Sequence, residues 1–339
     1  MVKQRELGKN TGTFVNPIGL GCMGMSDLYG PSDGEEANMK VLNRALELGC
    51  HFWDTSDVYG LGGNELLLGK YFAKSGNRSK VFLCTKFGLI RDKHSNKLLG
   101  VNGKPEYVRE CCENSLERLG VDTIDLYYQH RVDPKTPIEV TVTAMKELIK
   151  EGKVRYLGLS ECSPEILRRA HSIHPITAVQ MEYSPWTLDI ENNGLLETAR
   201  ELGVTIVAYA PLGRGFLTGG IKSPGDLTQD DWRRTSPRFF PENFTKNMDL
   251  VKEIHQFSKT KNISPSELIL AWVIAQGKDF ITIPGTKRIK YLEENVKGGQ
   301  VELSDQDLLA LRRIINAAEI SGARQNSSQG ISSSNSNTQ

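Results

Sequence analysis

Four side chains that together could protonate a reacting carbonyl group lie in the first 130 residues: Asp54, Tyr59, Lys86 and His130. A tyrosine hydroxyl has a pKa near ~10, and a neighbouring cation favours its phenolate form. A lysine held by an aspartate supplies that cation. A histidine can donate a hydrogen bond to a carbonyl oxygen and orient it. The set indicates protonation of an alkoxide as hydride reaches an aldehyde or ketone, although each residue taken alone also has an ordinary structural interpretation.

These side chains need strands that bring them together, and short β-branched or aromatic runs alternate with amphipathic helical stretches. The strands that we expect are Pro17–Gly21, His51–Thr55, Val81–Lys86, Ile124–His130, Arg155–Ser160, Ala178–Met181, Thr205–Tyr209 and Phe280–Ile283. Repeated βα units of this number predict an α/β fold, a single-domain (β/α)8 TIM barrel, in which reactive residues gather at the carboxyl ends of the strands. An open doubly wound sheet is the structural alternative.

The domain organisation follows from the same pattern. We expect one barrel domain over residues 1–323, with a long Gly- and Pro-rich loop at about 211–244 and a disordered polar tail over 324–339. Such a long loop in a compact domain is usually functional.

The composition narrows the class of partner. The chain has 339 residues and a net charge of +1, so nothing in its bulk charge favours nucleic acid. No apolar run is long enough to span a membrane. The six cysteines and six histidines show no metal-ligand spacing, and we expect no metal. We predict a cytoplasmic protein with reduced thiols; the sequence does not indicate an oligomeric state.

One glycine run matches G-x-G-x-x-G, the fingerprint of dinucleotide-binding Rossmann folds, at residues 19–24. That motif works only where a helix opens at its third glycine and points its N-terminus at the pyrophosphate. Here loop sequence follows Gly24, and no second strand ends in an acidic residue at the ribose distance. We therefore reject a Rossmann domain and expect these glycines to let the backbone approach a ligand.

Several segments together resemble the aldo-keto reductase family, in unbroken order from about Leu7 to Ile315. Within this family, the chain resembles the plant and fungal branch, which includes perakine reductase and auxin-induced-type reductases. The segments that carry it are Asp54–Gly60, Lys86, His130, Gly158–Ser160, Gln180, Tyr209–Gly213 and Ile283–Thr286.

This resemblance implies a (β/α)8 barrel that binds NADP(H) without a Rossmann motif and reduces a small carbonyl substrate. It implies Tyr59 as general acid, Lys86 and Asp54 as the pair that tunes it, and His130 as the carbonyl orienter. The cofactor residues that it implies are Met25, Ser160, Gln180, Tyr209, Leu212, Gly213, Gly215, Thr286, Lys287, Arg288, Glu294 and Asn295. Tyr209 is expected to stack on the nicotinamide, and Lys287 and Arg288 to hold the adenosine 2′-phosphate. For the substrate wall we expect Trp53, Tyr128 and Trp186, together with Met25, Leu28 and the loop after Gly213.

The chain also departs from the family pattern. Glu161 stands where many members have an asparagine that holds the carboxamide, and Ala210 replaces a common serine. Two other functions stay open at this point. One is a barrel aldolase that uses Lys86 as a Schiff-base amine, and the other is a non-catalytic NADP(H)-binding subunit of the same fold.

Overall fold

Eight parallel strands form the centre of the molecule in a computed structural model, which describes residues 3–27, 33–95, 97–229 and 231–324. They are β3 (Leu20–Gly21), β4 (Phe52–Asp54), β5 (Phe82–Phe87), β8 (Ile124–Gln129), β9 (Val154–Ser160), β10 (Ile176–Glu182), β11 (Thr205–Tyr209) and β12 (Phe280–Thr282). Neighbours in the chain are neighbours in the sheet. Parallel bridges from Ile18 to Thr282 and from Gly21 to Gly285 join its first and last strands. The sheet is thus closed, which confirms the barrel over the open sheet.

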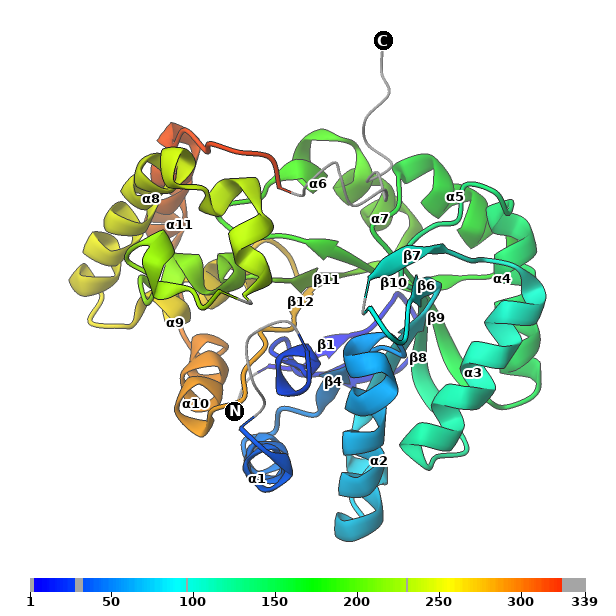
Figure 1. The fold of residues 1–339 in the computed structure, drawn as a ribbon. Coiled ribbons are helices and arrows are strands. Elements are labelled where there is room, and N and C mark those ends of the chain that lie inside the picture. Colours follow the sequence, from blue (N-terminus) through cyan, green and yellow to red (C-terminus); the bar gives the residue numbers. More distant parts are fainter. Residues whose placement is uncertain (1–2, 28–32, 96, 230, 325–339) are drawn as a thin grey trace.

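Helices surround this barrel (Figure 1). The ring consists of α1 (Glu35–Glu47), α2 (Gly63–Ser75), α3 (Pro105–Leu119), α4 (Ile138–Lys150), α5 (Pro164–Ile173), α7 (Leu195–Leu202), α9 (Pro265–Ile274) and α10 (Ile289–Gly298). Three further helices are α6 (Asp189–Asn192), α8 (Pro241–Thr260) and α11 (Asp305–Ala317). Local sequence sets several ends: Ser163 accepts a hydrogen bond from the Ile166 amide at the start of α5, and Gly120 takes the left-handed conformation (φ 62°) that ends α3. No helix among the described residues is long and apolar enough to cross a membrane.

The core has two layers because successive strand residues point to opposite faces of the sheet. In β4, Phe52 belongs to the cluster inside the barrel, where its ring stacks on Phe82 at 5.4 Å. Trp53 points outward and packs between the sheet and α2, with ring centroids 5.3 Å from Tyr71 and 6.1 Å from Phe72. Strand register therefore decides which side chains can reach the inside of the barrel.

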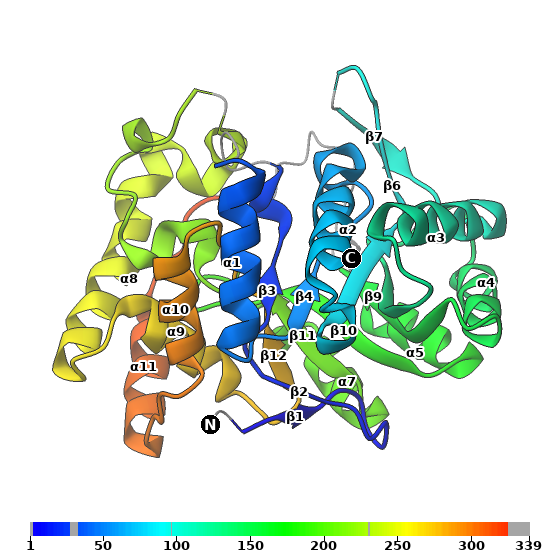
Figure 2. The same cartoon turned by 90° about the horizontal axis from the view of Figure 1, so that it is seen from below.

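The amino end of the barrel is covered by a hairpin of β1 (Arg5–Glu6) and β2 (Phe14–Val15), which lies opposite the β6–β7 end of the molecule (Figure 2). Leu7 and Val15 are buried in the barrel's interior cluster. Arg5 donates hydrogen bonds to the carbonyl oxygens of Phe280 and Ile274 at 2.5 and 2.7 Å. These contacts fill the amino end and leave the carboxyl ends of the strands as the open side.

Two insertions surround that open side. The first is a hairpin of β6 (Leu89–Arg91) and β7 (Leu98–Val101), which the sequence analysis did not identify. The second is the long connection after β11. It contains short 3-10 helices, beginning with η4 (Gly213–Thr218), and ends where α8 starts at Pro241 rather than at residue 245. Proline suits a first helical turn, which explains the earlier start.

Candidate active site

The four predicted catalytic side chains meet at the carboxyl ends of three neighbouring strands. Asp54 ends β4, Lys86 lies next to the end of β5, and His130 directly follows β8. Tyr59 opens the short helix η2 (Tyr59–Gly62) after β4. The Lys86 ammonium contacts three oxygens: Asp54 Oδ1, the Thr55 carbonyl at 2.9 Å and the Tyr59 hydroxyl at 3.3 Å. The sequence expectation that these residues share one site agrees with this geometry.

Lys86 and Asp54 form a buried ion pair. Both side chains are almost inaccessible, at 0% and 3% exposed, and Gln180 Nε2 donates to the other carboxylate oxygen of Asp54 at 2.8 Å. Burial disfavours the charged ammonium, but the negative charge of Asp54 and the hydrogen bonds to Asp54 and Tyr59 outweigh it and raise the pKa of Lys86. Lys86 is therefore a fixed cation beside the tyrosine hydroxyl.

Tyr59 is a protonated phenol under the field of that cation. Burial raises the pKa of Tyr59, and Lys86 opposes the increase without cancelling it. Lys86 thus lowers the pKa of Tyr59, as the sequence analysis expected, but burial raises this pKa by more than Lys86 lowers it. A Cβ added to Gly60 would lie 3.0 Å from the Ser26 carbonyl oxygen, and Gly60 itself has a φ of 55°. The turn that places Tyr59 therefore needs glycine at the next position.

His130 is held in its neutral form. Burial, followed by the charges of Lys86 and Arg131, lowers the pKa of His130 well below its usual value. Its Nδ1 lies 3.1 Å from the Ser56 hydroxyl, and its ring meets the Tyr59 ring edge-on with centroids 5.8 Å apart. One ring nitrogen is thus engaged by protein, and the neutral ring lies beside the phenol.

A cavity of about 1300 Å³ extends from these residues to the start of α10. It exceeds the roughly 300–1,000 Å³ typical of a site for one small ligand. Its lining includes most of the predicted cofactor residues: Ser160, Gln180, Tyr209, Leu212, Gly215, Thr286, Lys287, Arg288, Glu294 and Asn295. Met25 is buried, and Met23 and Gly24 line the cavity near it; Gly213 is buried against Trp186. Neither of these two residues lines the cavity: the Met25 side chain is packed in the core, and the Gly213 backbone lies too close to the Trp186 ring to leave room for a Cβ.

The far end of the cavity fits a phosphate group. Lys287 and Arg288 directly precede α10, whose N-terminus has no side-chain cap. The Lys287 ammonium lies 3.6 Å from Asp33, and the Arg288 guanidinium lies 5.9 Å from the centre of the Tyr291 ring. Two cations beside uncapped helical amides form a site for an anion. The opposite end, with Ser160, Gln180 and the Tyr209 ring, has the polar groups and flat surface that an amide-bearing aromatic ring needs.

The three aromatic residues predicted for the substrate wall do not line this cavity. Trp53 and Tyr128 are fully buried, one outside and one inside the barrel, and Trp186 stacks on Phe216 with ring centroids 4.4 Å apart. Large aromatic side chains in these strands and turns serve the core, and sequence alone could not separate that role from a pocket role. Leu28, also named there, lies outside the described residues.

Other cavity residues were missed by the sequence analysis. Leu89, Arg91 and Leu98 come from the β6–β7 hairpin, and Arg131 follows His130. Arg91 Nη1 pairs with Asp27 at 2.5 Å, tying the hairpin to the segment after β3. A sequence signal was available for Arg131 alone, because it directly follows the predicted strand Ile124–His130. No metal-binding group of three His, Cys, Asp or Glu occurs in the part of the chain that the structure describes.

Comparison with known proteins agrees with this architecture. Residues 17–316 match the family described as "Aldo/keto reductase family". The chain belongs to the aldo/keto reductase family. Among its reductase relatives, the aldo-keto reductase str7 of Strobilurus tenacellus is 52% identical over 94% of each chain. The aldo-keto reductase yakc [NADP(+)] of Schizosaccharomyces pombe is 49% identical over 95% of this chain and 94% of its own length.

A solved structure supports the same assignment. The glycerol dehydrogenase AKR11B4 from Gluconobacter oxydans superposes with a TM-score of 0.85 at 26% identity, covering 95% of this chain and 98% of that one. Family membership confirms the resemblance found in the sequence, and with it the barrel fold and the oxidoreductase class.

Proposed function

We propose that this aldo/keto reductase reduces an aldehyde or ketone to the alcohol with NADPH, with Tyr59 as the general acid. The observation that carries the proposal is the contact of the Tyr59 hydroxyl with the Lys86 ammonium at 3.3 Å, which Asp54 holds in place. Family membership supports oxidoreduction, and the name of the fission yeast relative supports NADP(H).

The cofactor would lie along the cavity. The uncapped start of α10 with Lys287 and Arg288 suits the adenosine 2′-phosphate, and Gly215 leaves room for the backbone to approach the pyrophosphate. Ser160 and Gln180 would bind the carboxamide beside Tyr209. NADPH, when bound, supplies the hydride.

The protein's part of the reaction is proton delivery. Tyr59 donates its hydroxyl proton to the carbonyl oxygen as negative charge develops there. The raised pKa keeps Tyr59 protonated before the reaction, and the Lys86 cation stabilises the phenolate that remains afterwards. Neutral His130, whose Nδ1 is occupied by Ser56, offers its other ring nitrogen to the same oxygen. Asp54 keeps Lys86 charged and in position.

The substrate wall would come from the β6–β7 hairpin and its surroundings. Leu89 and Leu98 contribute apolar surface, and Arg91 and Arg131 contribute cations next to His130. This lining suits a small carbonyl compound with an apolar part and a polar or anionic part.

The other two functions are less well supported. A Schiff base needs a neutral lysine, but the pKa of Lys86 is raised and its ammonium is committed to Asp54, Thr55 and Tyr59. A non-catalytic subunit has no need for an intact acid, cation and histidine at one point.

Tyr59→Phe tests the proposal. We expect kcat/KM for NADPH-dependent reduction of an aldehyde to fall on the order of 10²–10⁴-fold, because the acid is lost, while NADPH binding measured by fluorescence stays within about threefold. The control is Tyr156→Phe, whose hydroxyl lies 2.7 Å from Thr13 at the other end of the barrel. Unchanged turnover in Tyr59→Phe would overturn the role of Tyr59, and absence of NADPH binding in the wild type would overturn the cofactor.

A further inference from the structure

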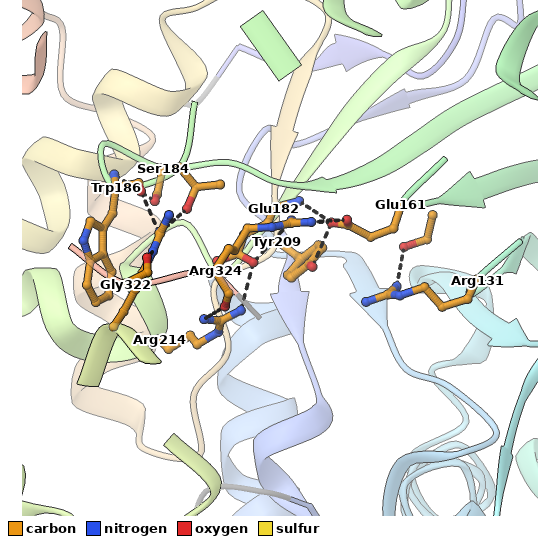
Figure 3. A network of polar contacts seen from close by, with 12 residues as sticks. Arg131, Glu161, Glu182, Ser184, Trp186, Tyr209, Arg214, Gly322 and Arg324 are labelled. Atoms are coloured by element: carbon orange, nitrogen blue, oxygen red, sulfur yellow. Dashed lines mark hydrogen bonds and ion pairs between the residues drawn. The ribbon is translucent and has the colours of Figure 1, made fainter. Parts of the chain in front are cut away.

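Two buried carboxylates and two arginines form a connected set of ion pairs beside Tyr209 (Figure 3). Arg324 makes a bidentate ion pair with Glu161, with N–O distances of 2.9 and 2.6 Å. The Tyr209 hydroxyl donates to the same carboxylate at 2.8 Å. Glu161 is one of the two residues that depart from the family pattern described above, so this chain has a carboxylate where many members have an amide.

The second carboxylate extends the contacts to the loop after β11. Arg214 Nη2 donates to Glu182 at 2.9 Å, and Arg324 lies 3.4 Å from the same oxygen. Arg214 also donates to the Arg324 carbonyl oxygen at 3.3 Å. We call Glu161, Glu182, Arg214 and Arg324 the charge network. It joins the ends of β9 and β10 to the segment after α11.

The charge network lies directly behind the wall assigned to the nicotinamide, and Arg214 is its one member that lines the cavity. Glu161 directly follows Ser160, and Tyr209 and Arg214 line the cavity. Glu161 takes a φ of 51°, an uncommon conformation for a residue with a Cβ, which persists only where the surroundings enforce it. Its carboxylate is thus fixed at the hydroxyl of Tyr209, the residue on whose ring the nicotinamide is expected to stack.

Charge at this position distinguishes the two redox states of the cofactor. The oxidised nicotinamide ring carries a positive charge that the reduced ring lacks. An unpaired carboxylate nearby attracts the oxidised ring, and an unpaired guanidinium repels it. A carboxylate paired with a guanidinium has almost no net charge, so it favours neither the oxidised nor the reduced cofactor.

We propose that Arg324 and Glu161 set the relative affinity of this enzyme for NADPH and NADP⁺, with Arg324 cancelling the field of Glu161 at the nicotinamide. Arg324 also acts as a positioning residue, since it holds the carboxylate that binds the Tyr209 hydroxyl. The inference rests on the proposed function, because it requires NADP(H) in the cavity.

The electrostatics of the pair agree with this role. Burial would raise the pKa of Glu161, but Arg324, Arg131 and the Tyr209 hydroxyl outweigh it and lower the pKa to about 2. The carboxylate of Glu161 is therefore ionised at neutral pH, and its charge has to be balanced by the arginine.

Opposite changes in two single variants test the proposal. The readout is the ratio of the dissociation constant of NADP⁺ to that of NADPH, measured by fluorescence quenching or calorimetry without a substrate. In Arg324→Gln the unbalanced carboxylate favours NADP⁺, and we expect the ratio to fall on the order of tenfold. In Glu161→Gln the unbalanced guanidinium favours NADPH, and we expect the ratio to rise by a similar factor. The double variant should return to the wild-type ratio.

The controls separate charge from structural damage. Arg324→Lys keeps the charge but loses the bidentate contact, so the ratio should stay near the wild type even if both affinities fall. Arg312→Gln removes an arginine of α11 that pairs with Glu191 at 2.9 Å and does not line the cavity, so the ratio should not change. If both single variants shift the ratio in the same direction, or leave it unchanged, the proposal is overturned. If the wild type binds neither NADP⁺ nor NADPH, the proposed function fails instead.

Discussion

The mouth of the barrel contains two buried sets of charges that differ in how the chain assembles them. One is the catalytic cluster: Asp54, Tyr59, Lys86 and His130. The other is the charge network around Tyr209. In the cluster, the ion pair joins β4 and β5, strands that hydrogen-bond to each other along the barrel. In the network, Arg324 pairs with Glu161 from 163 residues away and comes from a segment that belongs to no strand.

Buried ion pairs in this protein are therefore held in place in two different ways. Main-chain hydrogen bonds between strands hold the Lys86–Asp54 pair in place, whereas the charge network depends on how the segment after α11 packs. We therefore expect the cluster to control chemistry and to resist changes at the C-terminus. We expect the network to control cofactor binding and to be lost when the C-terminal segment is removed.

The largest effect is expected from Lys86→Met. Loss of the cation should lower kcat/KM by at least about 10³-fold. It should also lower the free energy of unfolding by about 3–5 kcal/mol, because Asp54 keeps a buried charge without its partner. Steady-state kinetics and urea unfolding measure the two effects. Lys80→Met changes an exposed lysine that precedes the same strand and should shift stability by less than about 0.5 kcal/mol. Equal effects of the two variants would contradict the assigned role of the ion pair.

Shortening the chain tests the second half of the comparison. A chain that ends at Ala323 lacks Arg324 and should lose about 2–4 kcal/mol of unfolding free energy, since Glu161 loses its bidentate cation. We expect kcat at saturating NADPH to change by less than about tenfold, because the catalytic cluster remains. A chain that ends at Ser328 keeps Arg324 and is the matched control. If the two shortened chains unfold alike, the contribution of Arg324 to stability is refuted.

An intermediate effect is expected at the far end of the cavity, where charges are more exposed. Replacing both Lys287 and Arg288 with alanine should raise KM for NADPH by roughly 10- to 100-fold and leave KM for NADH nearly unchanged. The effect should shrink at high salt, because exposed charges are screened. Alanine at Lys290, an exposed lysine in the first turn of α10, is the control. Equal losses with both cofactors would place the 2′-phosphate elsewhere.

The smallest effect concerns pH. The pKa of His130 is lowered in the folded state, so between the ordinary value near ~6.5 and the lower folded value the unfolded chain binds more protons. Stability contributed by neutral His130 is present above pH ~6.5 and is lost as the pH falls, with a slope of at most about 1.4 kcal/mol per pH unit. His130→Gln should reduce that slope in urea unfolding between pH 7 and 5. An unchanged slope would show that His130 does not titrate as described.

The pKa of Glu161 is also lowered, but from a lower ordinary value, so its contribution fades in a more acidic range, from pH ~4.5 towards about 2. The charge network therefore stays ionised between pH 7 and 5. Because burial raises the pKa of Asp57 to about 7, only the difference between the wild type and His130→Gln isolates the contribution of His130.

Much of the fold and of the catalytic cluster could be predicted from the sequence for a simple reason. A parallel barrel places the carboxyl end of every strand at the same mouth, so recognising the strands that end near Asp54, Lys86 and His130 already placed these side chains together. Lys287 and Arg288 could be placed in the same way, because they precede the helix that follows the last strand.

Tertiary packing alone decided the rest. The sequence is equally consistent with a core role or a pocket role for Trp53, Tyr128 and Trp186. The direction of their side chains in the strands and the packing of the loops place all three in the core. Arg324 stood in the sequence as the first residue of a polar tail, and only the path of the chain after α11 brings it to Glu161. Sequence periodicity determines local structure and strand ends, whereas the pairing of residues so far apart depends on the free energy of packing the whole chain.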